Sequence, residues 1–422
     1  MKLKKLIWLI GLIGLIGGPV RAQKQYSVRH YSVNDGLSQN TVMAILQDRD
    51  GFMWFGTWDG LNRFDGYEFR TYKPTLFDET LSSNRIDVLY EDSLGYIWMR
   101  TYSGAYYRLD KHTEQIMATN VSDTRMGTGL PQKSLLVEPR KGEVWVAGGR
   151  SLLRVEEEEQ ELYTLQGEVR CLLSTPDGTV WAATTKGLEK EEQLLKPGRT
   201  DEENCFLVGC YDGKYLWFGT ASGVIWRFLQ KTGRFERIDI GVGSAITNIV
   251  EQDANTLIVT TDGDGFVCYD KRSDRAELYN SGSCPLIQSD RFYDVYVDRR
   301  GDVWMENEER GLLRFARDTH EVKRYMSDID ERYDHQLNLN FIVFEDRHGR
   351  LWLNPQGGGF ACYNAETDSL EDRLGGVTNM IHSAYMDDNE NLWLGTYDLG
   401  LDRISEVDYP FELYDLRQDL HH

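Results

Sequence analysis

Aromatic side chains lie beside carboxylates at matching points of several repeating segments. Two such pairs are Trp58–Asp59 and Tyr397–Asp398. A polyhydroxylated ligand needs flat aromatic faces next to planar hydrogen-bonding groups, because its rings stack and its hydroxyls form hydrogen bonds. We therefore predict a ligand site formed by the following residues: Trp58, Asp59, Tyr102, Asn307, Arg310, Gln356, Tyr397 and Asp398. The alternative is that these side chains are ordinary exposed turn residues or part of an interface between two domains.

Catalytic chemistry has weaker support in the sequence. No histidine pair has the helix spacing of metal ligands, and neither a Gly-x-Ser-x-Gly elbow nor a Walker loop occurs. The segment 262–265 (DGDG) resembles part of a calcium loop but lacks the closing Glu, so we expect a turn there. In a propeller that cleaves glycans, Asp59 and Asp398 would be the paired carboxylates. We predict a chain that is not an enzyme and that holds neither a cofactor nor a metal.

The candidate side chains must be positioned by a repeating unit, which is clearest in residues 40–72. Four short runs rich in aromatic and branched residues are separated by turn residues: 41–46, 52–57, 61–65 and 67–72. Such runs predict strands. The frame recurs around an anchor residue in the second strand: Trp54, Trp98, Trp145, Trp181, Trp217, Ile258, Trp304, Trp352 and Trp393. Nine units with anchors 36 to 48 residues apart predict the four-stranded blades of a β-propeller.

The residues that recur from unit to unit have a physical interpretation. Asp-x-x-Gly segments such as 48–51 predict hairpin turns, in which Asp bonds the backbone ahead of it and Gly supplies the positive φ. The Trp is expected to pack between adjacent sheets. An Arg nine or ten residues beyond it predicts hydrogen bonds between blades, at Arg63, Arg108, Arg154, Arg227, Arg314 and Arg403. Ligand contact is the alternative role for these arginines.

The N-terminus has the pattern of a secretory signal. Three lysines precede an apolar stretch at 6–16, and Val20-Arg21-Ala22 predicts cleavage before Gln23. An uncleaved anchor is the alternative. The formal net charge is −21, and removal of residues 1–22 makes the mature chain more negative still. Such a surface repels phosphate backbones and anionic membranes, so we expect no nucleic acid partner and no membrane contact.

Six cysteines follow the leader, and none forms a CxxC pair, which gives no indication of a zinc site. An exported chain allows disulfides, with Cys205–Cys210 and Cys268–Cys284 as candidate pairs. Cys268 and Cys362 fall at the same place in two units, which favours their being small strand residues.

The first and last units carry a family resemblance. Residues 34–40 (NDGLSQN), 54–66 (WFGTWDGLNRFDG) and 393–401 (WLGTYDLGL) closely resemble the two-component regulator propeller repeat. The resemblance spans nearly the whole mature chain and is weaker between residues 130 and 290. It implies the periplasmic sensor region of Bacteroidetes hybrid histidine kinases, in which two seven-bladed propellers precede a membrane helix and a kinase, and in which oligosaccharides are the usual ligands.

The resemblance also shapes the expected domain layout. Residues 1–22 are expected to be the signal peptide, 23–330 a seven-bladed propeller, and 331–422 two units that begin a second propeller. One larger ring over 23–422 is the alternative. The chain opens on an outer strand near Tyr26–Tyr31 whose own blade is expected elsewhere in a longer protein; the alternative is a closed ring that uses this strand as an extra clasp. Residues 411–414 are expected to be a further outer strand. The kinase region is absent, so the chain is expected to be truncated.

The leading functional hypothesis is a periplasmic ligand-sensing domain of a hybrid two-component system that binds an oligosaccharide or another small ligand. The alternatives are a propeller glycan lyase or hydrolase, and a protein-interaction scaffold. Expected partners beyond the ligand are a second copy of the chain or a missing C-terminal sensor and kinase region.

Overall fold

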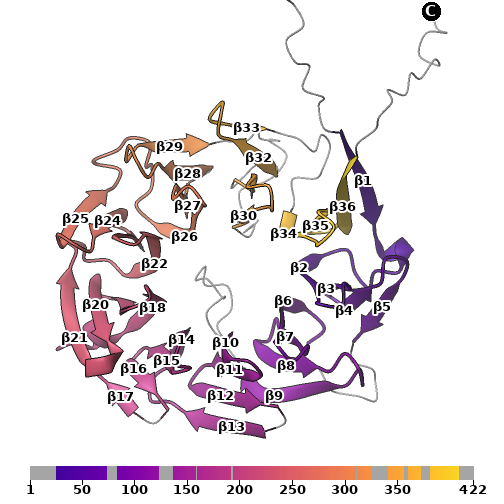
Figure 1. Ribbon diagram of the computed structural model, residues 1–422, viewed down its shortest axis with the longest axis horizontal. Coiled ribbons are helices and arrows are strands. Elements are labelled where there is room, and N and C mark those ends of the chain that lie inside the picture. Colours follow the sequence, from indigo (N-terminus) through magenta and orange to yellow (C-terminus); the bar gives the residue numbers. More distant parts are fainter. Residues whose placement is uncertain are drawn as a thin grey trace, which may run out of the picture.

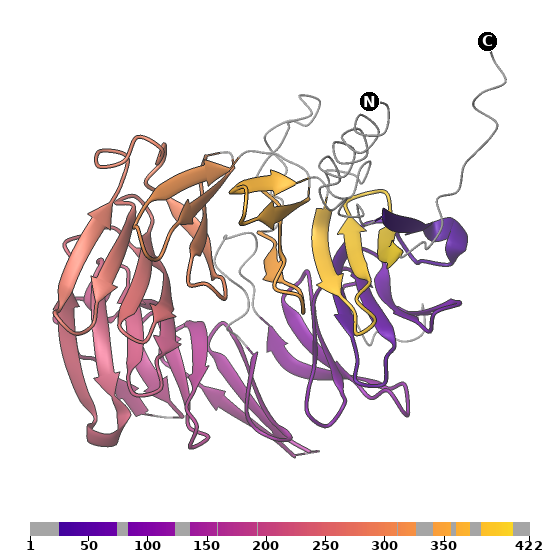
Figure 2. The ribbon, with the colours of Figure 1, turned by 45° about the horizontal axis from the view of Figure 1, so that its top comes forward.

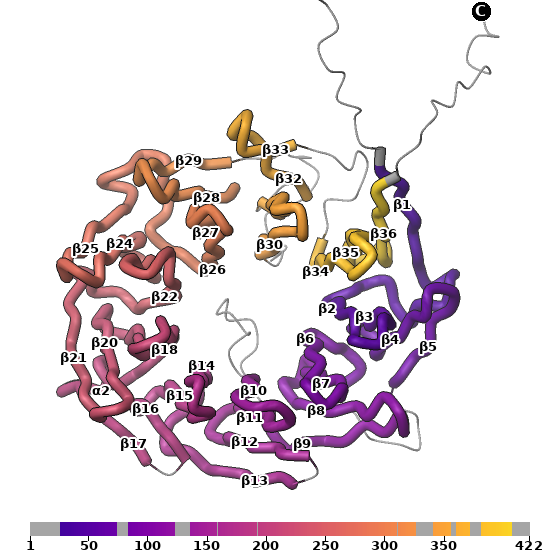
Figure 3. The backbone as a smooth tube through the Cα atoms, in the orientation of Figure 1, coloured from indigo at the N-terminus to yellow at the C-terminus, as the bar shows by residue number. Residues whose placement is uncertain are grey.

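The protein is a ring of small antiparallel sheets, as a computed structural model shows (Figure 1). The structure describes residues 25–73, 83–122, 136–157, 159–191, 193–309, 311–325, 341–355, 360–371 and 381–407. These residues form nine four-stranded sheets arranged as blades around a central axis. The first strand of each blade lies nearest the axis and the fourth lies at the rim, as the backbone trace also shows (Figure 3).

The strands follow one another in sequence within eight of the blades. Blades one to three contain β2(Val42–Gln47), β3(Met53–Thr57), β4(Gly60–Phe64) and β5(Phe69–Tyr72), then β6(Ile86–Glu91), β7(Ile97–Thr101), β8(Ala105–Leu109) and β9(Ile116–Ser122), then β10(Leu136–Arg140), β11(Glu143–Gly148), β12(Ser151–Glu156) and β13(Glu159–Thr164). Blades four to six contain β14(Val169–Ser174), β15(Val180–Thr184), β16(Gly187–Lys190) and β17(Gln193–Leu195), then β18(Phe206–Tyr211), β19(Leu216–Thr220), β20(Val224–Leu229) and β21(Arg234–Asp239), then β22(Ile246–Asp253), β23(Thr256–Thr261), β24(Phe266–Asp270) and β25(Arg275–Tyr279).

The remaining blades complete the ring. Blade seven contains β26(Phe292–Val297), β27(Val303–Asn307), β28(Leu312–Phe315) and β29(Val322–Tyr325), and blade eight contains β30(Val343–Glu345), β31(Leu351–Leu353), β32(Ala361–Asn364) and β33(Ser369–Glu371). Blade nine contains β34(Ile381–Met386), β35(Leu392–Thr396) and β36(Leu401–Val407), with β1(Gln25–Tyr31) as its outer strand. Three short helical turns lie between strands: η1(Val33–Asp35), α2(Asp201–Asn204) and η3(Gln230–Thr232).

The turn prediction for the Asp-x-x-Gly segments is confirmed. Asp48 Oδ1 accepts hydrogen bonds from the backbone N–H groups of Asp50 and Phe52, both at 3.0 Å, and Gly51 has a φ of 89°. The same Asp has a second role that the sequence pattern did not reveal. Its Oδ2 accepts the indole N–H of Trp54 at 2.8 Å. One carboxylate therefore ties the hairpin turn to the anchor residue of its blade.

This carboxylate–indole bond repeats around the ring with lengths of 2.7 to 3.0 Å. The acceptors are Asp48, Asp92, Asp212, Asp298, Asp346 and Asp387, for Trp54, Trp98, Trp217, Trp304, Trp352 and Trp393. Blade three uses Glu143 instead, which accepts from Trp145 at 2.9 Å. A buried indole N–H requires such an acceptor, because leaving it unpaired costs about 1–3 kcal/mol.

The hydrophobic core lies between neighbouring blades, as the Trp positions predict. The anchor Trp54 of blade one packs with Ile86, Ile97 and Met99 of blade two, and all four are fully buried or nearly so. Ile258, which replaces the anchor Trp in blade six, is fully buried in the same way against blade seven. Each sheet face is therefore covered by the next blade, which is why a single blade could not bury its own core.

The first strand of the chain closes the ring. All seven residues of β1 pair with β36 in an antiparallel register that runs from Gln25↔Val407 to Tyr31↔Leu401. The two strands lie side by side in Figure 1. The expectation that this opening strand serves a blade elsewhere is wrong, because β1 is the outer strand of blade nine. The other expected outer strand, 411–414, lies outside the described residues.

The expected seven-bladed propeller with the start of a second is also wrong, because the described residues form nine blades. We expected one propeller to end between blades seven and eight. These two blades instead pack together, and we call the contact between neighbouring blades a seam. Trp304, Leu312 and Tyr325 of blade seven share a buried cluster with Leu351 and Tyr363 of blade eight. Blade nine packs in turn against blade one, where Trp393 lies with Val42 and Phe55.

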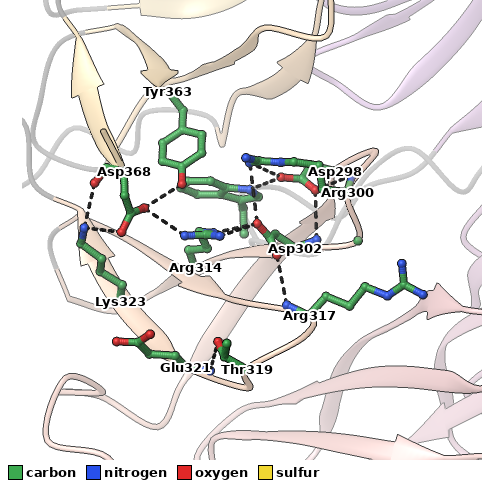
Figure 4. A network of polar contacts seen from close by, with 12 residues as sticks. Asp298, Arg300, Asp302, Arg314, Arg317, Thr319, Glu321, Lys323, Tyr363 and Asp368 are labelled. Atoms are coloured by element: carbon green, nitrogen blue, oxygen red, sulfur yellow. Dashed lines mark hydrogen bonds and ion pairs between the residues drawn. The ribbon is translucent and has the colours of Figure 1, made fainter. Parts of the chain in front are cut away.

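A polar network reinforces the seam between blades seven and eight (Figure 4). The carboxylate of Asp368 accepts hydrogen bonds from Arg314 Nη1 at 2.9 Å, Lys323 Nζ at 2.6 Å and the Tyr363 hydroxyl at 2.7 Å. Arg314 also bonds Asp302 of its own blade, through Nε at 2.8 Å. The sequence pattern showed nine similar units but not this cross-blade network, so it could not indicate that the ring continues past residue 325.

The recurring arginines fulfil their predicted role at several seams. Arg108 donates to the backbone oxygen of Glu157 in blade three at 2.8 Å, and Arg63 lies 3.9 Å from Glu114 in blade two. Arg154 instead bonds Glu143 within its own blade. The interpretation as cross-blade hydrogen bonding therefore holds for some units and not for others.

Candidate functional site

The antiparallel order of each blade places two kinds of loop on one face of the ring. The second and third strands are joined where the first strand begins, so these loops lie beside the connections from one blade to the next. We call this the connection face. Figure 2 shows the ring tilted by 45°, with the strands of each blade running between its two faces. Two backbone hydrogen bonds tie the loops together: Trp58 N–H donates to Thr41 O at 3.2 Å and Tyr102 N–H to Arg85 O at 2.9 Å. Both loops therefore sit directly over the start of a first strand.

Three predicted aromatic residues come together on the connection face, over blades nine, one and two. The Trp58 and Tyr397 rings meet edge to face with centroids 5.4 Å apart. The Arg85 guanidinium lies over both Trp58, at 5.1 Å, and Tyr102, at 4.3 Å. Trp58 and Tyr102 are 37% and 43% exposed. Large aromatic surfaces thus remain open to solvent while the guanidinium holds them in place.

His382 completes this group, which we call the mouth cluster: Trp58, Arg85, Tyr102, His382 and Tyr397. The His382 ring lies 5.3 Å from that of Tyr397 at the start of β34. Burial, with a smaller contribution from the charge of Arg85, lowers the pKa of His382 below its ordinary value. The imidazole is therefore neutral at pH 7 and acts as a further flat ring.

Arg85 is fixed by a carboxylate beneath the aromatic rings. Its Nε donates to Asp87 Oδ1 at 2.7 Å, and the Asp87 side chain is largely buried. Burial raises the pKa of Asp87, against the opposing effects of Arg85 and, more weakly, of Arg100. Two guanidinium groups therefore act on one carboxylate at this point of the connection face.

Asp59, one of the two predicted catalytic carboxylates, is held by neighbouring side chains. Asp59 accepts hydrogen bonds from Lys73 Nζ at 2.9 Å and from Asn84 Nδ2 at 2.8 Å. The bond from Lys73 lowers the pKa of Asp59, which leaves it ionised and tethered rather than able to donate a proton. Asp398 is exposed beside Tyr397. This environment gives no support to the glycan lyase or hydrolase alternative.

The other predicted site residues have different positions. Asn307 is 1% exposed and donates to the backbone oxygen of Ser289 at 2.8 Å, which is a structural role at the end of β27. Arg310 and Gln356 lie outside the described residues. The structure thus assembles Trp58, Tyr102 and Tyr397, places Asp59 and Asp398 next to them, and keeps Asn307 in the framework of blade seven.

Sequence reasoning missed Arg85, Asp87 and His382. All three lie at or just before the start of the first strand of a blade. In this part of the sequence the pattern predicts only a strand and indicates no binding residue. A usable signal was nonetheless present. Residue 41 and residue 85 follow the asparagines of equivalent Leu-Ser-x-Asn segments, so equivalent positions meet the second-to-third loop in each blade.

Metal and disulfide chemistry find no support within the described ranges. Across these residues no group of three or more His, Cys, Asp or Glu side chains could hold a metal ion. The expected turn at 262–265 is confirmed, and Asp264 accepts hydrogen bonds from the backbone of Gly243 and Ser244. All six cysteines are free, so neither candidate disulfide forms.

Comparison with known proteins turns on the segment that carries Trp58. Residues 36–59 match the family described as two component regulator propeller. This segment of blade one is therefore similar to a two-component regulator propeller repeat. A segment of 75 residues of this propeller is also 37% identical to Histidine kinase P4 of Formosa agariphila, and covers 18% of the chain and 6% of that kinase.

Solved structures similar to this propeller include two extracellular domains of hybrid two-component systems of B. thetaiotaomicron. They are 20% and 16% identical, with TM-scores of 0.40 and 0.41, and cover 92% and 90% of the chain. The chain spans little more than half of each of them, 54% and 58%. A computationally designed protein, Ika8, is 13% identical with a TM-score of 0.48, over 87% of the chain and 97% of its own length. No helix in the described part of the propeller is long and apolar enough to cross a membrane.

Proposed function

We propose that this propeller is the ligand-sensing part of a two-component signalling protein, located outside the cytoplasm, and that it binds an oligosaccharide at the mouth cluster. Two findings support the proposal: the family match over residues 36–59 and the convergence of exposed aromatic rings from three blades on one face. The convergence carries the argument for the place of binding. Sugar rings stack on aromatic faces, and hydroxyl groups bond the planar polar groups beside them.

The position of the cluster suits a sensor. Its residues come from blades nine, one and two, so a ligand that touches them all joins the last blade to the first. The described chain begins and ends in blade nine, at Gln25 of β1 and Val407 of β36. Binding at this point would bias the blade from which the chain continues, and a sensor needs that coupling between its ligand and its neighbouring segments.

Calorimetry and thermal unfolding of the purified protein against a panel of oligosaccharides test the proposal. We expect saturable binding of one oligosaccharide and a rise in the melting temperature with its concentration. Trp58→Ala should weaken this binding about tenfold or more, since stacking energy of about 1.4 kcal/mol or more is lost.

The matched control is Tyr67→Ala. Tyr67 is 92% exposed in the turn between β4 and β5, on the face opposite the connection face, and its loss should leave binding unchanged. Equal binding by the Trp58→Ala variant and the unmodified protein would show that the mouth cluster is not the site. Binding of none of the sugars would reject the oligosaccharide proposal itself.

A further inference from the structure

Arg85 has only part of its hydrogen-bonding capacity used within the protein. Its Nε donates to Asp87, and its flat faces lie against Trp58 and Tyr102. No described residue accepts a hydrogen bond from either terminal nitrogen, Nη1 or Nη2. The side chain is 28% exposed. A planar guanidinium is thus held by its inner edge and its faces, while its outer edge is open to a ligand at the mouth cluster.

Cationic and anionic groups surround Arg85 at this spot. Arg85 and Arg100 both act on the single carboxylate of Asp87. The nearby Asp59 is compensated by Lys73, with a second hydrogen bond from Asn84. His382 is neutral, because burial lowers its pKa. Asp398, exposed beside Tyr397, adds a negative charge to this face. The attraction for an anion therefore comes from the open edge of Arg85 and not from a net positive charge.

We propose that the ligand is an acidic oligosaccharide and that Arg85 reads the carboxylate of a uronic acid unit through its two terminal nitrogens. The inference rests on the proposed function and names its ligand class. The paired N–H groups of a guanidinium match the two oxygens of a planar carboxylate, and such bidentate pairs are stronger and more directional than contacts from Lys. The sugar ring stacks on the aromatic rings of Trp58 and Tyr397, and the Arg85 guanidinium binds the carboxylate group.

The bond from Asp87 gives Arg85 its orientation. Without it the guanidinium could still lie on the rings but would be free to turn. Asp87 is therefore a positioning residue.

The test compares uronic acid oligosaccharides with their fully methyl-esterified counterparts by calorimetry on the complete chain. The two sets share the same sugar rings and differ only at the carboxyl group, which is charged in the acid and capped by a methyl group in the ester. We expect the acidic form of a binding sugar to bind at least about tenfold more tightly than its ester, and to lose that advantage as salt is added. Equal binding of acid and ester would overturn the inference and leave the oligosaccharide proposal standing.

Substitutions of Arg85 test whether this side chain causes the preference for the acid over the ester. Arg85→Gln should make the acid and the ester bind alike, whereas Arg85→Lys should retain only part of the preference because an ammonium group cannot pair with both oxygens. Arg291→Gln is the matched control on the same face; Arg291 lies in blade seven, 3.7 Å from Asp262, and its loss should change nothing. An unaltered preference in Arg85→Gln would assign the carboxylate to another residue and overturn the inference. If Arg85→Gln fails to fold, the acid-to-ester ratio of the unmodified protein decides alone.

Discussion

Tyr31 stacks on Trp393 with ring centroids 5.8 Å apart and an angle of 19° between the planes. The two residues belong to the first and the second-last strand of the described chain, and Tyr31 also meets Phe64 of blade one at 5.2 Å. Only 2% of Tyr31 is exposed. The N-terminal strand therefore does more than pair its backbone with β36: it supplies a core side chain where blade nine meets blade one.

Closure of the ring should depend on this ring stack. We expect Tyr31→Ala to lower the free energy of unfolding by about 3 kcal/mol, because it leaves a cavity among aromatic neighbours. Tyr31→Phe is the control. The Tyr31 hydroxyl is buried and has no hydrogen-bond partner among the described residues, so its removal should be neutral or stabilising. Denaturant unfolding measures both, and equal losses in the two variants would contradict the stacking role.

The seam between blades seven and eight should weaken when Asp368 loses its charge. Burial opposes ionisation, but hydrogen bonds from Lys323, Tyr325 and Tyr363 outweigh it and hold the pKa of Asp368 well below 3.8. We expect Asp368→Asn to cost about 1 kcal/mol at neutral pH, a modest value because the side chain is 41% exposed and solvent screens the interaction.

A depressed pKa fixes the pH dependence of this effect. The stabilisation is present above the ordinary pKa of an aspartate and is lost as the pH falls through the lower pKa of the folded state. The difference in unfolding free energy between the unmodified protein and Asp368→Asn should therefore shrink in acid. A difference that stays constant down to the acid limit would show that the charge of Asp368 contributes nothing to the seam.

Blade four offers a stabilising substitution. Thr175 stands where six other blades carry the Asp that accepts the indole hydrogen bond, and Trp181 Nε1 is buried without a partner among the described residues. We expect Thr175→Asp to raise the unfolding free energy by about 1 kcal/mol by supplying that acceptor. The same pair of carboxylates occurs in blade one, where Lys111 Nζ lies 3.3 Å from Asp48 and 2.6 Å from Asp50. Thr175→Ala, which supplies no acceptor, should not stabilise, and a similar gain there would refute the explanation.

Glu306 should make stability depend on pH near neutrality. Burial, with a further contribution from its cross-strand neighbour Asp294, raises the pKa of Glu306 to about 8. The folded protein then keeps a proton that the unfolded chain has already lost between about pH 5 and pH 8. Because the folded state binds one more proton than the unfolded state, the unfolding free energy falls by about 1.4 kcal/mol for each pH unit as the pH rises through that window.

Glu306→Gln removes this proton equilibrium. Relative to the unmodified protein, the variant should gain stability steadily from pH 5 to pH 8 and no further above pH 8. Unfolding curves in urea at several pH values give the difference directly. Asp294→Asn should shift the window to lower pH, because it removes the neighbouring negative charge. A difference that does not vary with pH would place the Glu306 pKa near its ordinary value.

Much of the architecture followed from local sequence patterns. Strand alternation, Asp-x-x-Gly turns and the recurring Trp predicted the blades, and the strands of blade one lie within two residues of their predicted ends. Three members of the mouth cluster were also predictable, since Trp58, Tyr102 and Tyr397 occupy equivalent loops. These features depend on interactions within one hairpin or one blade, which the order of residues specifies directly.

The tertiary structure alone decided how the units assemble. The count of blades in the ring depends on the pairing of Tyr31 with Leu401 and on the bonds that Asp368 forms across a seam, and both join segments that a repeating pattern treats as equivalent or unrelated. Arg85 likewise gained its place between Trp58 and Tyr102 only when two blades packed together. Such contacts arise from the curvature of the stacked sheets, and no property of a single repeat encodes them.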